Sequence, residues 1–446
     1  MKAEYGLLKK DFYVYFVGVG GISMSALALF LVKTGFKVGG YDANLSSVTN
    51  ALSEAGVEIN NPSSAMRCDL AVISSAISSN DEVLRYLKQL NKPVITRARL
   101  LYEIASTYPF VIGIAGTHGK TTCTAMVAHV LKYANKGFCA HIGGFDKDFG
   151  NILINGEDIF LSEVCEFKRN ISMFTANLGV LLNIDDDHLD SYGSKEKLKE
   201  EFGAFLNRSK IRILPLEEAN LVEDGITFSL TDSRANYCAQ EIEYLDNRAI
   251  ECFIMENGKK LFRLELNSFL MHDIKNALAC VGACRAIGIE ANEIKAGLES
   301  FKGVKRRNEI MGKIEGCTVY ADYAHHPEQL EKTIKMLELK YDNYAVLFQS
   351  HTYSRTANLY KQFLKALSKV KNLFIFDTYG AREKYTYSGS GKRLSEDLNG
   401  CIYCSSSKTV GAILKGIAGK FECVAVLGAG DLYDETEKFL KEEKSR

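Results

Sequence analysis

The sequence has no excess of charge of either sign and no long apolar run. Lysine plus arginine number 55, aspartate plus glutamate also number 55, and the formal net charge is +0. Because nucleic acids are bound largely through cationic side chains, this balance argues against a nucleic-acid partner. No apolar run reaches the ~20 residues of a membrane span, and the start lacks the apolar core of a signal peptide. We therefore expect a cytoplasmic protein with no membrane partner.

Paired cysteine motifs are also scarce. The 12 cysteines are scattered, and the C-x-x-C formed by Cys401 and Cys404 has no second pair with which to complete a zinc site. In a reducing cytosol, small apolar cysteines mainly fill the core. We interpret them as free buried thiols.

The length predicts several domains. A chain of 446 residues is too long for a single hydrophobic core. Its 46% hydrophobic and 25% charged residues are typical of a globular protein. Short β-branched runs alternate with longer helical patterns, which is typical of α/β proteins with parallel sheets. We predict an α/β fold with three domains, 1–108, 109–303 and 304–446.

The same alternation places the individual strands. One strand is expected to end at Asp42, and a polar tract over 209–260 is expected to hold small antiparallel strands. A helix is expected through Ile274, Leu278 and Val281. The remaining strands are predicted at 13–17, 70–73, 93–96, 110–115, 158–162, 178–184, 318–321, 345–349, 373–377 and 423–427.

A first glycine loop follows the strand predicted at 13–17. Gly18, Gly20 and Ser23 give G-x-G-x-x-S, which departs from the dinucleotide fingerprint at its third position. The loop favours a diphosphate at a helix N-terminus, from either NAD or a UDP-sugar. Asp42, at the end of the next strand, could hold a ribose hydroxyl or could be a turn aspartate, and the sequence leaves both open.

A second loop, GIAGTHGKTT from Gly113 to Thr122, lies between a predicted strand and a predicted helix. Backbone N–H groups can face phosphate oxygens there, Lys120 can neutralise the β and γ oxygens, and Thr121 can bind Mg²⁺. The strict G-x-x-x-x-G-K-T spacing is not met, because Ile114 stands five residues before Gly119. The strand, loop and helix together nevertheless predict a phosphate site.

Acidic and histidine side chains follow two further strands. Glu163 comes after an apolar run, with Glu166 a turn beyond, and His188 lies within NIDDDHLD. Strand C-termini line the ligand crevice of α/β sheets, so we predict that Glu163 and His188 bind a metal ion. Asp185 and Asp187 are interpreted as solvated loop residues.

The last region carries a second polar cluster. His325 and His326 follow one predicted strand, and His351 follows another. With Tyr323 and Arg355 they could bind a carboxylate and an amine, because arginine offers a planar fork of donors. The alternative is a buried structural histidine at each strand end. His129, within the helix after the second loop, is interpreted as a packing residue.

Ten motifs in order, spread over almost the whole chain, resemble the Mur ligase family. They are FVGVGGISMSALA, SSAISSNDEV, AGTHGKTT, NIDDDHLDSYGS, NAL at 276–278, GVKRRNE, DYAHHPEQL, FQSHTYSRT, DTYGAREK and LGAGD. The resemblance implies a Rossmann-like N-terminal UDP-sugar domain, a central P-loop ATPase domain with a mostly parallel sheet, and a C-terminal Rossmann-like domain that brings the amino acid.

The resemblance also implies roles for individual residues. Lys120, Glu163 and His188 would be catalytic, and Thr121, Glu163 and His188 would hold Mg²⁺, for which Mn²⁺ could substitute. The amino-acid substrate, L-alanine, would be bound by Tyr323, His325 and Arg355. ATP would be bound by Gly116, Thr117, His118, Gly119, Lys120, Thr121, Thr122, Asn276, Arg306, Arg307 and Asp322. The UDP-sugar would be bound by Gly18, Val19, Gly20, Gly21, Ile22, Ser23, Asp42 and Ser75.

The implied reaction joins L-alanine to the lactyl carboxylate of UDP-N-acetylmuramate with ATP, through an acyl phosphate, in a monomer or a homodimer. The chain departs from the family pattern at Ala321, Ser350 and Thr352.

Alternative functions remain open. One is that of a related ligase that attaches a whole peptide to UDP-N-acetylmuramate, although the tract FQSHTYSRT argues against it. A nicotinamide-dependent oxidoreductase is another alternative, but it would not explain the second loop, Gly113 to Thr122. A non-enzymatic nucleotide switch is a third alternative, but it would not explain the polar cluster of the last region.

Overall fold

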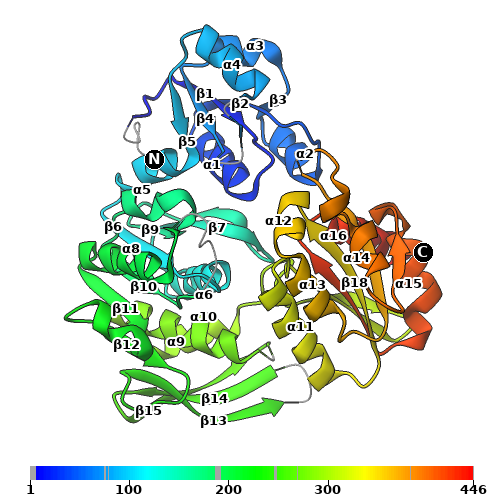
Figure 1. Ribbon diagram of the computed structural model, residues 1–446. Helices are drawn as coiled ribbons and strands as arrows, with labels where there is room; N and C mark the ends of the chain where they lie inside the picture. Colours follow the sequence, from blue (N-terminus) through cyan, green and yellow to red (C-terminus); the bar gives the residue numbers. More distant parts are fainter. Residues whose placement is uncertain are drawn as a thin grey trace. The chain divides into compact units, whose positions relative to one another are not determined.

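The computed structural model describes residues 7–74, 77–78, 80–185, 192–245, 249–268, 270–381 and 383–444. The chain divides into two compact units, Met1–Lys302 and Gly303–Arg446. The described residues form three sheets, two in the first unit and one in the second (Figure 1). The α/β fold with mostly parallel sheets is therefore confirmed, whereas the domain limits at 108 and 303 stay predictions.

The first sheet is parallel and has the strand order β3-β2-β1-β4-β5. Strand β1, YVYFV, is buried along its whole length, as expected for a central strand with helices on both faces. The order reverses between β1 and β4, and α/β sheets generally bind ligands at the carboxyl ends of the strands at such a point. The elements are β1 (Tyr13–Val17), α1 (Ile22–Lys33), β2 (Lys37–Tyr41), α2 (Ser47–Glu54), β3 (Glu58–Ile59), α3 (Pro62–Arg67), β4 (Leu70–Ile73), α4 (Glu82–Gln89), β5 (Val94–Thr96) and α5 (Arg97–Ala105).

The second sheet has the order β15-β14-β13-β12-β11-β10-β6-β9-β7-β8. Its middle is parallel, and helices α6, α9 and α10 pack on one another beside it (Figure 1). The elements are β6 (Phe110–Ala115), α6 (Lys120–Tyr133), β7 (Phe138–Asp146), β8 (Gly150–Ile154), β9 (Ile159–Glu163), η1 (Phe167–Met173), β10 (Leu178–Leu181), α8 (Lys195–Arg208), β11 (Ile211–Pro215), η2 (Leu216–Leu221), β12 (Ile226–Ser229), β13 (Tyr237–Leu245), β14 (Ala249–Glu256), β15 (Lys259–Leu266), α9 (Met271–Ala286) and α10 (Ala291–Glu299).

The polar tract over 209–260 holds parallel as well as the expected antiparallel strands. Strands β13, β14 and β15 form the predicted antiparallel ribbon. Strands β11 and β12, however, extend the parallel sheet. The sequence misled here because short strands at the margin of a sheet carry little apolar periodicity, and their pairing is set by the neighbouring strand.

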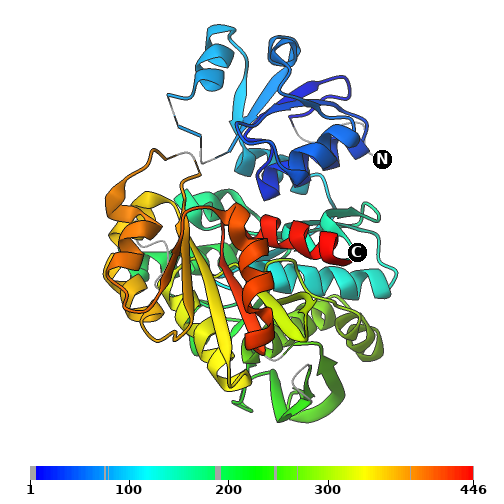
Figure 2. The same ribbon diagram turned by 90° about the vertical axis from the view of Figure 1, so that its right-hand side faces the viewer.

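The third sheet has the order β16-β17-β21-β18-β19-β20, and it is parallel except for β16. In Figure 2, α15 and α16 (red) cover one face of the sheet, and yellow and orange helices cover the other. The elements are β16 (Glu309–Ile314), β17 (Cys317–Asp322), α11 (Pro327–Lys340), β18 (Tyr344–His351), α12 (Tyr353–Asn358), α13 (Tyr360–Leu367), β19 (Leu373–Tyr379), η3 (Tyr387–Gly389), α14 (Gly391–Glu396), β20 (Ile402–Cys404), η4 (Ser407–Thr409), α15 (Val410–Ile417), η5 (Ala418–Lys420), β21 (Cys423–Gly428) and α16 (Leu432–Lys444). Among the helices described, none is both long and apolar enough to cross a membrane.

Candidate functional site

The second loop joins β6 to α6, as predicted, and the neighbouring strand braces it. Asn183 follows β10, which pairs with β6. Its side chain accepts a hydrogen bond from His118 N at 2.8 Å and donates one to His118 O at 3.0 Å, while its carbonyl accepts from Thr117 N at 3.2 Å. The loop is thus held by backbone and amide contacts within the protein. Sequence reasoning missed Asn183, because this bracing depends on strand order.

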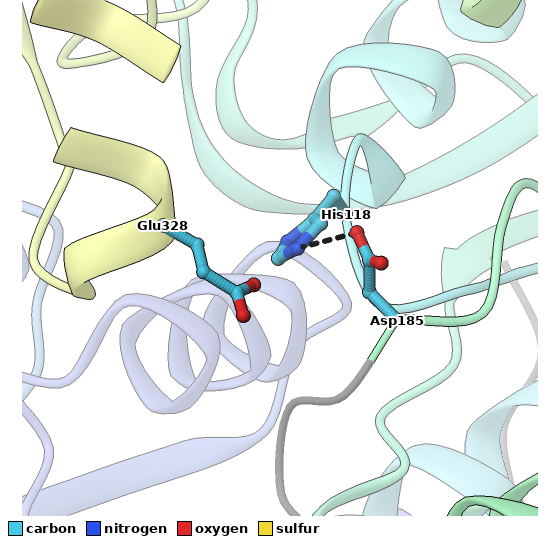
Figure 3. A group of neighbouring side chains, drawn as sticks. All are labelled: His118, Asp185 and Glu328. Atoms are coloured by element: carbon cyan, nitrogen blue, oxygen red, sulfur yellow. Dashed lines mark ion pairs between the residues drawn. The ribbon is translucent and has the colours of Figure 1, made fainter. Parts of the chain in front are cut away.

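Asp185 corrects a second expectation, since it is not merely a solvated loop residue. Its backbone N–H donates to Thr117 Oγ1 at 2.9 Å. Its carboxylate lies 3.4 Å from His118 Nε2, the ion pair that Figure 3 marks with a dashed line. Asp185 therefore orients the His118 side chain of the phosphate loop. Asp187 and His188 lie outside the described residues, so the predicted metal role of His188 stays a prediction.

Gly119 and Asn276 approach each other at the start of α6. Gly119 has φ +83°, and a Cβ at this position would lie 2.5 Å from Asn276 Oδ1. Only glycine adopts this backbone readily and leaves room for the amide. Asn276, on α9, is 4% exposed, and its Nδ2 has no hydrogen-bond partner among the described residues. A buried donor without a partner is costly, so this N–H group is suited to a ligand acceptor beside the loop.

Lys120 is held inside the loop by oxygen atoms. Its Nζ donates to Gly116 O at 2.5 Å, to Thr117 O at 3.2 Å and to Glu166 Oε1 at 2.9 Å. Burial lowers the pKa of Lys120, but the carboxylates of Glu166 and Glu163 outweigh burial and raise it above its ordinary value. The ammonium is therefore charged at neutral pH and can neutralise a phosphate. The sequence places Glu166 one turn beyond Glu163 but does not predict that it pairs with Lys120.

Thr121 and Glu163 bring two oxygen ligands together. Thr121 Oγ1 donates to Glu163 Oε2 at 2.9 Å, from the first turn of α6 to the last residue of β9. Hydroxyl and carboxylate oxygens suit Mg²⁺, so this donor set fits the implied ion. Thr122, the next residue of α6, is half-buried.

The first loop runs from β1 into α1, also as predicted. Gly18 N and Val19 N donate to Tyr41 O at 2.7 Å and 3.1 Å. Gly21 is the N-cap of α1, and Ile22 is its first residue. Asp42 accepts from Gly20 N at 2.8 Å and from Asn44 N at 3.1 Å. Its structural role in the turn is thus observed, and contact with a ribose stays a prediction.

Ser23 has partners that the sequence did not indicate. Its Oγ lies 2.8 Å from His141 Nε2, and Arg97 Nη1 donates to it at 3.1 Å. His141 lies on β7, in the second sheet, and no local motif marks it. Ser75, the other predicted UDP-sugar residue, lies outside the described residues.

In the second unit, Asp322, Arg306 and Arg307 each contact neighbouring residues near the start of β16. Asp322 Oδ2 accepts from Asn308 N at 2.8 Å. Arg306 pairs with Asp434 and donates to Gly430 O at 3.3 Å. The guanidinium of Arg307 lies over the ring of Tyr323, 4.8 Å from its centroid. The predicted nucleotide role of these three residues stays a prediction.

The predicted amino-acid residues do lie together. The rings of Tyr323 and His325 are 5.0 Å apart, and those of His325 and His351 are 6.3 Å apart. Burial, and then the charge of Arg355, lower the pKa of His325 to about 3 and that of His351 to about 4. Both imidazoles are therefore neutral at pH 7. His351 Nδ1 is buried and has no partner among the described residues, so it can accept a hydrogen bond from a ligand. His326 is the N-cap residue of α11.

The departures from the family pattern lie in the same region. Ser350 is buried and pairs with Thr378 Oγ1 at 2.7 Å. Thr352 precedes α12, the helix that carries Arg355, and has φ +66°. A β-branched residue rarely adopts this conformation, and such strain is most often found beside functional groups.

His129 corrects a third expectation, because it does more than pack. Its Nδ1 lies 3.1 Å from Ser300 Oγ, and its Nε2 lies 3.2 Å from Asp146 Oδ2. The ring is 4% exposed and ties α6 to the end of α10 and to the end of β7. Helical periodicity alone could not show these polar partners, since they lie far away in the sequence.

Comparison with known families assigns the whole chain to one family. The Mur ligase family catalytic domain matches residues 13–109, and the Mur ligase middle domain matches residues 114–284. The glutamate ligase domain of Mur ligases matches residues 306–430. The three matches follow one another in the order of the three sheets.

Individual relatives agree along the full length. The chain is 34% identical to a UDP-N-acetylmuramate–L-alanine ligase of Acetivibrio thermocellus, over 97% of this chain and 96% of the relative. Its fold is similar to that of a UDP-N-acetylmuramate-alanine ligase from Thermotoga maritima, with a TM-score of 0.83, 24% identity, and coverage of 98% and 100% of the two chains. It is also similar to that of a murein peptide ligase from Psychrobacter arcticus, with a TM-score of 0.76, 20% identity, and coverage of 97% and 98%. The chain belongs to the Mur ligase family.

Proposed function

We propose that the protein joins L-alanine to the lactyl carboxylate of UDP-N-acetylmuramate, with conversion of ATP to ADP and phosphate, in peptidoglycan precursor synthesis in the cytoplasm. The observation that carries the proposal is the loop at β6 and α6. It places the Lys120 ammonium, the Thr121–Glu163 oxygen pair and the Asn276 amide around one helix N-terminus. The full-length similarity to ligases of this name supports the choice of substrates.

Different described residues would bind the three substrates. Backbone N–H groups at the start of α6 and the ammonium of Lys120 would bind the phosphates of ATP. The loop from Gly18 to Ser23, at the start of α1, would hold the diphosphate of the sugar nucleotide. In the second unit, Arg355 would bind the carboxylate of alanine, because its guanidinium offers two parallel donors.

A carboxylate is a poor acyl donor at neutral pH, so it has to be activated first. We propose that the lactyl carboxylate oxygen attacks the γ-phosphorus of ATP, while the bond to the β–γ bridging oxygen breaks and ADP leaves. Lys120 would stabilise the charge that develops on the transferred phosphoryl group. The neutral amine of alanine would then attack the acyl carbon, form the amide, release phosphate and lose a proton to solvent.

Mg²⁺ would be held by Thr121, Glu163 and His188, and would supply charge stabilisation at the phosphates. The hydrogen bond from the Thr121 hydroxyl to Glu163 keeps the two oxygens adjacent. His351 would accept a hydrogen bond from the amino group of alanine through Nδ1, which has no partner within the described part of the chain. The remaining step, exclusion of water from the acyl phosphate, is a task for closure of the active site.

Phosphate release tests the proposal directly. Purified protein with Mg·ATP and UDP-N-acetylmuramate should release phosphate only when L-alanine is added. Lys120→Ala should abolish release while the circular dichroism spectrum is retained, whereas Lys361→Ala, at an exposed position on α13, should not change it. Release that requires a peptide in place of alanine would indicate a peptide ligase instead. Full turnover by Lys120→Ala would overturn the assigned loop.

A further inference from the structure

A buried histidine on the second sheet contacts the first turn of α1. His141, on β7, is 1% exposed, and both of its ring nitrogens have partners. Nε2 lies 2.8 Å from Ser23 Oγ, and Nδ1 lies 3.0 Å from Ser162 Oγ. Ser162 is the residue before Glu163 on β9, next to β7 in the sheet. The ring thus spans the distance from the first glycine loop to the strand that ends in the predicted metal ligand.

The donors and acceptors of this chain can be assigned one by one. Ser162 Oγ donates its only proton to Glu163 O at 2.9 Å, so it can only accept from His141 Nδ1–H. His141 Nε2 then carries a lone pair, and the hydroxyl of Ser23 must donate to it. Ser23 Oγ in turn accepts from Arg97 Nη1 at 3.1 Å. The hydrogen bonds run in one direction, from Arg97 to the backbone carbonyl of Glu163.

This arrangement requires a neutral ring. A protonated imidazole would donate from both nitrogens, and the Ser23 hydroxyl would lose its acceptor. Burial, and then the charge of Arg97, lower the pKa of His141 to about 3. The single tautomer with the proton on Nδ1 is therefore maintained at neutral pH.

A second contact docks the same turn without reaching β9. Asn151, on β8, donates from Nδ2 to Ile22 O and to Ser25 Oγ, both at 2.9 Å. Asn151 is 2% exposed, so its loss disturbs a buried contact comparable to that of His141. It has no bond to Ser162 or Glu163 in the hydrogen bonds described, which makes it a matched control.

We propose that His141 is a positioning residue that couples the Gly18–Ser23 loop to Glu163, so that binding of the sugar nucleotide strengthens binding of the Mg²⁺-bound nucleotide. The inference rests on the proposed function of the two loops. A diphosphate at the start of α1 favours the docked position of Ser23, and that position favours the hydrogen bonds that hold the end of β9. Both ligands select the same arrangement, so each should increase the affinity for the other by an equal factor.

Calorimetric titration of the full chain tests the coupling. The affinity for the magnesium complex of a non-hydrolysable ATP analogue is measured with and without saturating UDP-N-acetylmuramate. We expect the wild-type affinity to rise about fivefold or more with the sugar nucleotide bound. In His141→Asn, the amide can still donate to Ser162 but cannot reach Ser23, and the ratio should fall to about one. Asn151→Ala should keep the wild-type ratio even if its stability falls.

The remaining outcomes also decide for or against the coupling. Should His141→Asn fail to fold, Ser162→Ala breaks the same chain one bond further on and should lower the ratio in the same way. A wild-type ratio of one, an unchanged ratio in both His141→Asn and Ser162→Ala, or an equal loss in Asn151→Ala overturns the coupling through His141. Phosphate release by the same wild-type sample is measured in parallel, so failure of the proposed reaction is seen separately from failure of the coupling.

Discussion

The hydroxyl of Thr121 donates a hydrogen bond to Glu163 Oε2 at 2.9 Å, joining the first turn of α6 to the end of β9. Strand β6, which leads into the loop before Thr121, and strand β9, which ends at Glu163, pair in parallel, with Ile114 opposite Glu163. The sheet register therefore sets the separation of these two oxygen atoms. A neutral hydroxyl can bind a cation through its lone pair, so Thr121 and Glu163 would together offer two oxygen ligands to Mg²⁺.

Glu163→Gln should weaken the response to magnesium. The amide keeps the shape of the side chain but removes the negative charge that attracts the cation, so the Mg²⁺ concentration for half-maximal phosphate release should rise at least about tenfold. Excess chelator should stop release by the wild-type enzyme, and added Mg²⁺ should restore it. Thr121→Ser retains the hydroxyl and should respond almost as the wild type does, whereas Thr121→Val should resemble Glu163→Gln. An unchanged magnesium curve in Glu163→Gln would remove Glu163 from the metal site.

Gly119→Ala should weaken nucleotide binding. The substitution adds a Cβ 2.5 Å from Asn276 Oδ1 and also strains a backbone with φ +83°. Gly288→Ala separates the two effects, because Gly288 has φ +77° but a Cβ added there would have no atom within 4 Å. Both variants should lose about 1 kcal/mol of stability from backbone strain. Only Gly119→Ala should lower ADP affinity, by about tenfold or more in a calorimetric titration, and equal losses in both variants would contradict the close-approach argument.

Much of the fold could be predicted because its signals are local. Strand β1 is a short buried run, and the glycines after it, like those after β6, mark strand-to-helix turns. The second loop was predicted despite its irregular spacing, since strand, loop and helix follow one another in the sequence. Strands β11 and β12 could not be assigned correctly, because their pairing depends on partners rather than on their own pattern.

The partners of the site residues could not be predicted, because they come from other strands. Asn183 reaches His118 only because β10 pairs with β6. His141 reaches Ser23 across more than a hundred residues of sequence. The motifs identify the groups that would contact ligands, whereas the sheet order determines which side chains orient them.

Arg355→Lys should raise the KM for L-alanine. Lysine keeps the charge but loses the planar fork that binds a carboxylate through two hydrogen bonds, so we expect an increase of about tenfold to a hundredfold. The KM for ATP should stay within about twofold. Arg393→Lys, on α14, is a suitable control, because Arg393 lies over the ring of Tyr360 and donates to Ser388 O, away from the two histidines. An alanine KM unchanged in Arg355→Lys would exclude Arg355 from the amino-acid site.

Acid should destabilise the first unit through His141. The pKa of this residue falls from 6.5 to about 3 on folding, chiefly because the ring is buried. Between these values the unfolded chain binds a proton that the folded chain does not, so stability rises with pH in this range. The contribution is constant above pH 6.5 and is lost progressively as the pH falls from 6.5 towards 3.

His141→Asn should therefore reduce the dependence of stability on pH, whatever its effect at neutral pH. At about pH 5, protonation of the free histidine stabilises the unfolded wild-type chain by about 2 kcal/mol, and the variant lacks this effect. The stability difference between wild type and variant should thus shrink by about 2 kcal/mol between about pH 7.5 and about pH 5, in urea unfolding followed by circular dichroism. Asn151→Ala, which removes a buried contact to the same turn of α1 without removing an ionisable group, should leave the slope unchanged. Parallel pH curves for wild type and His141→Asn would mean that His141 is protonated equally in the folded and unfolded chain, and the neutral hydrogen-bond chain would then be wrong.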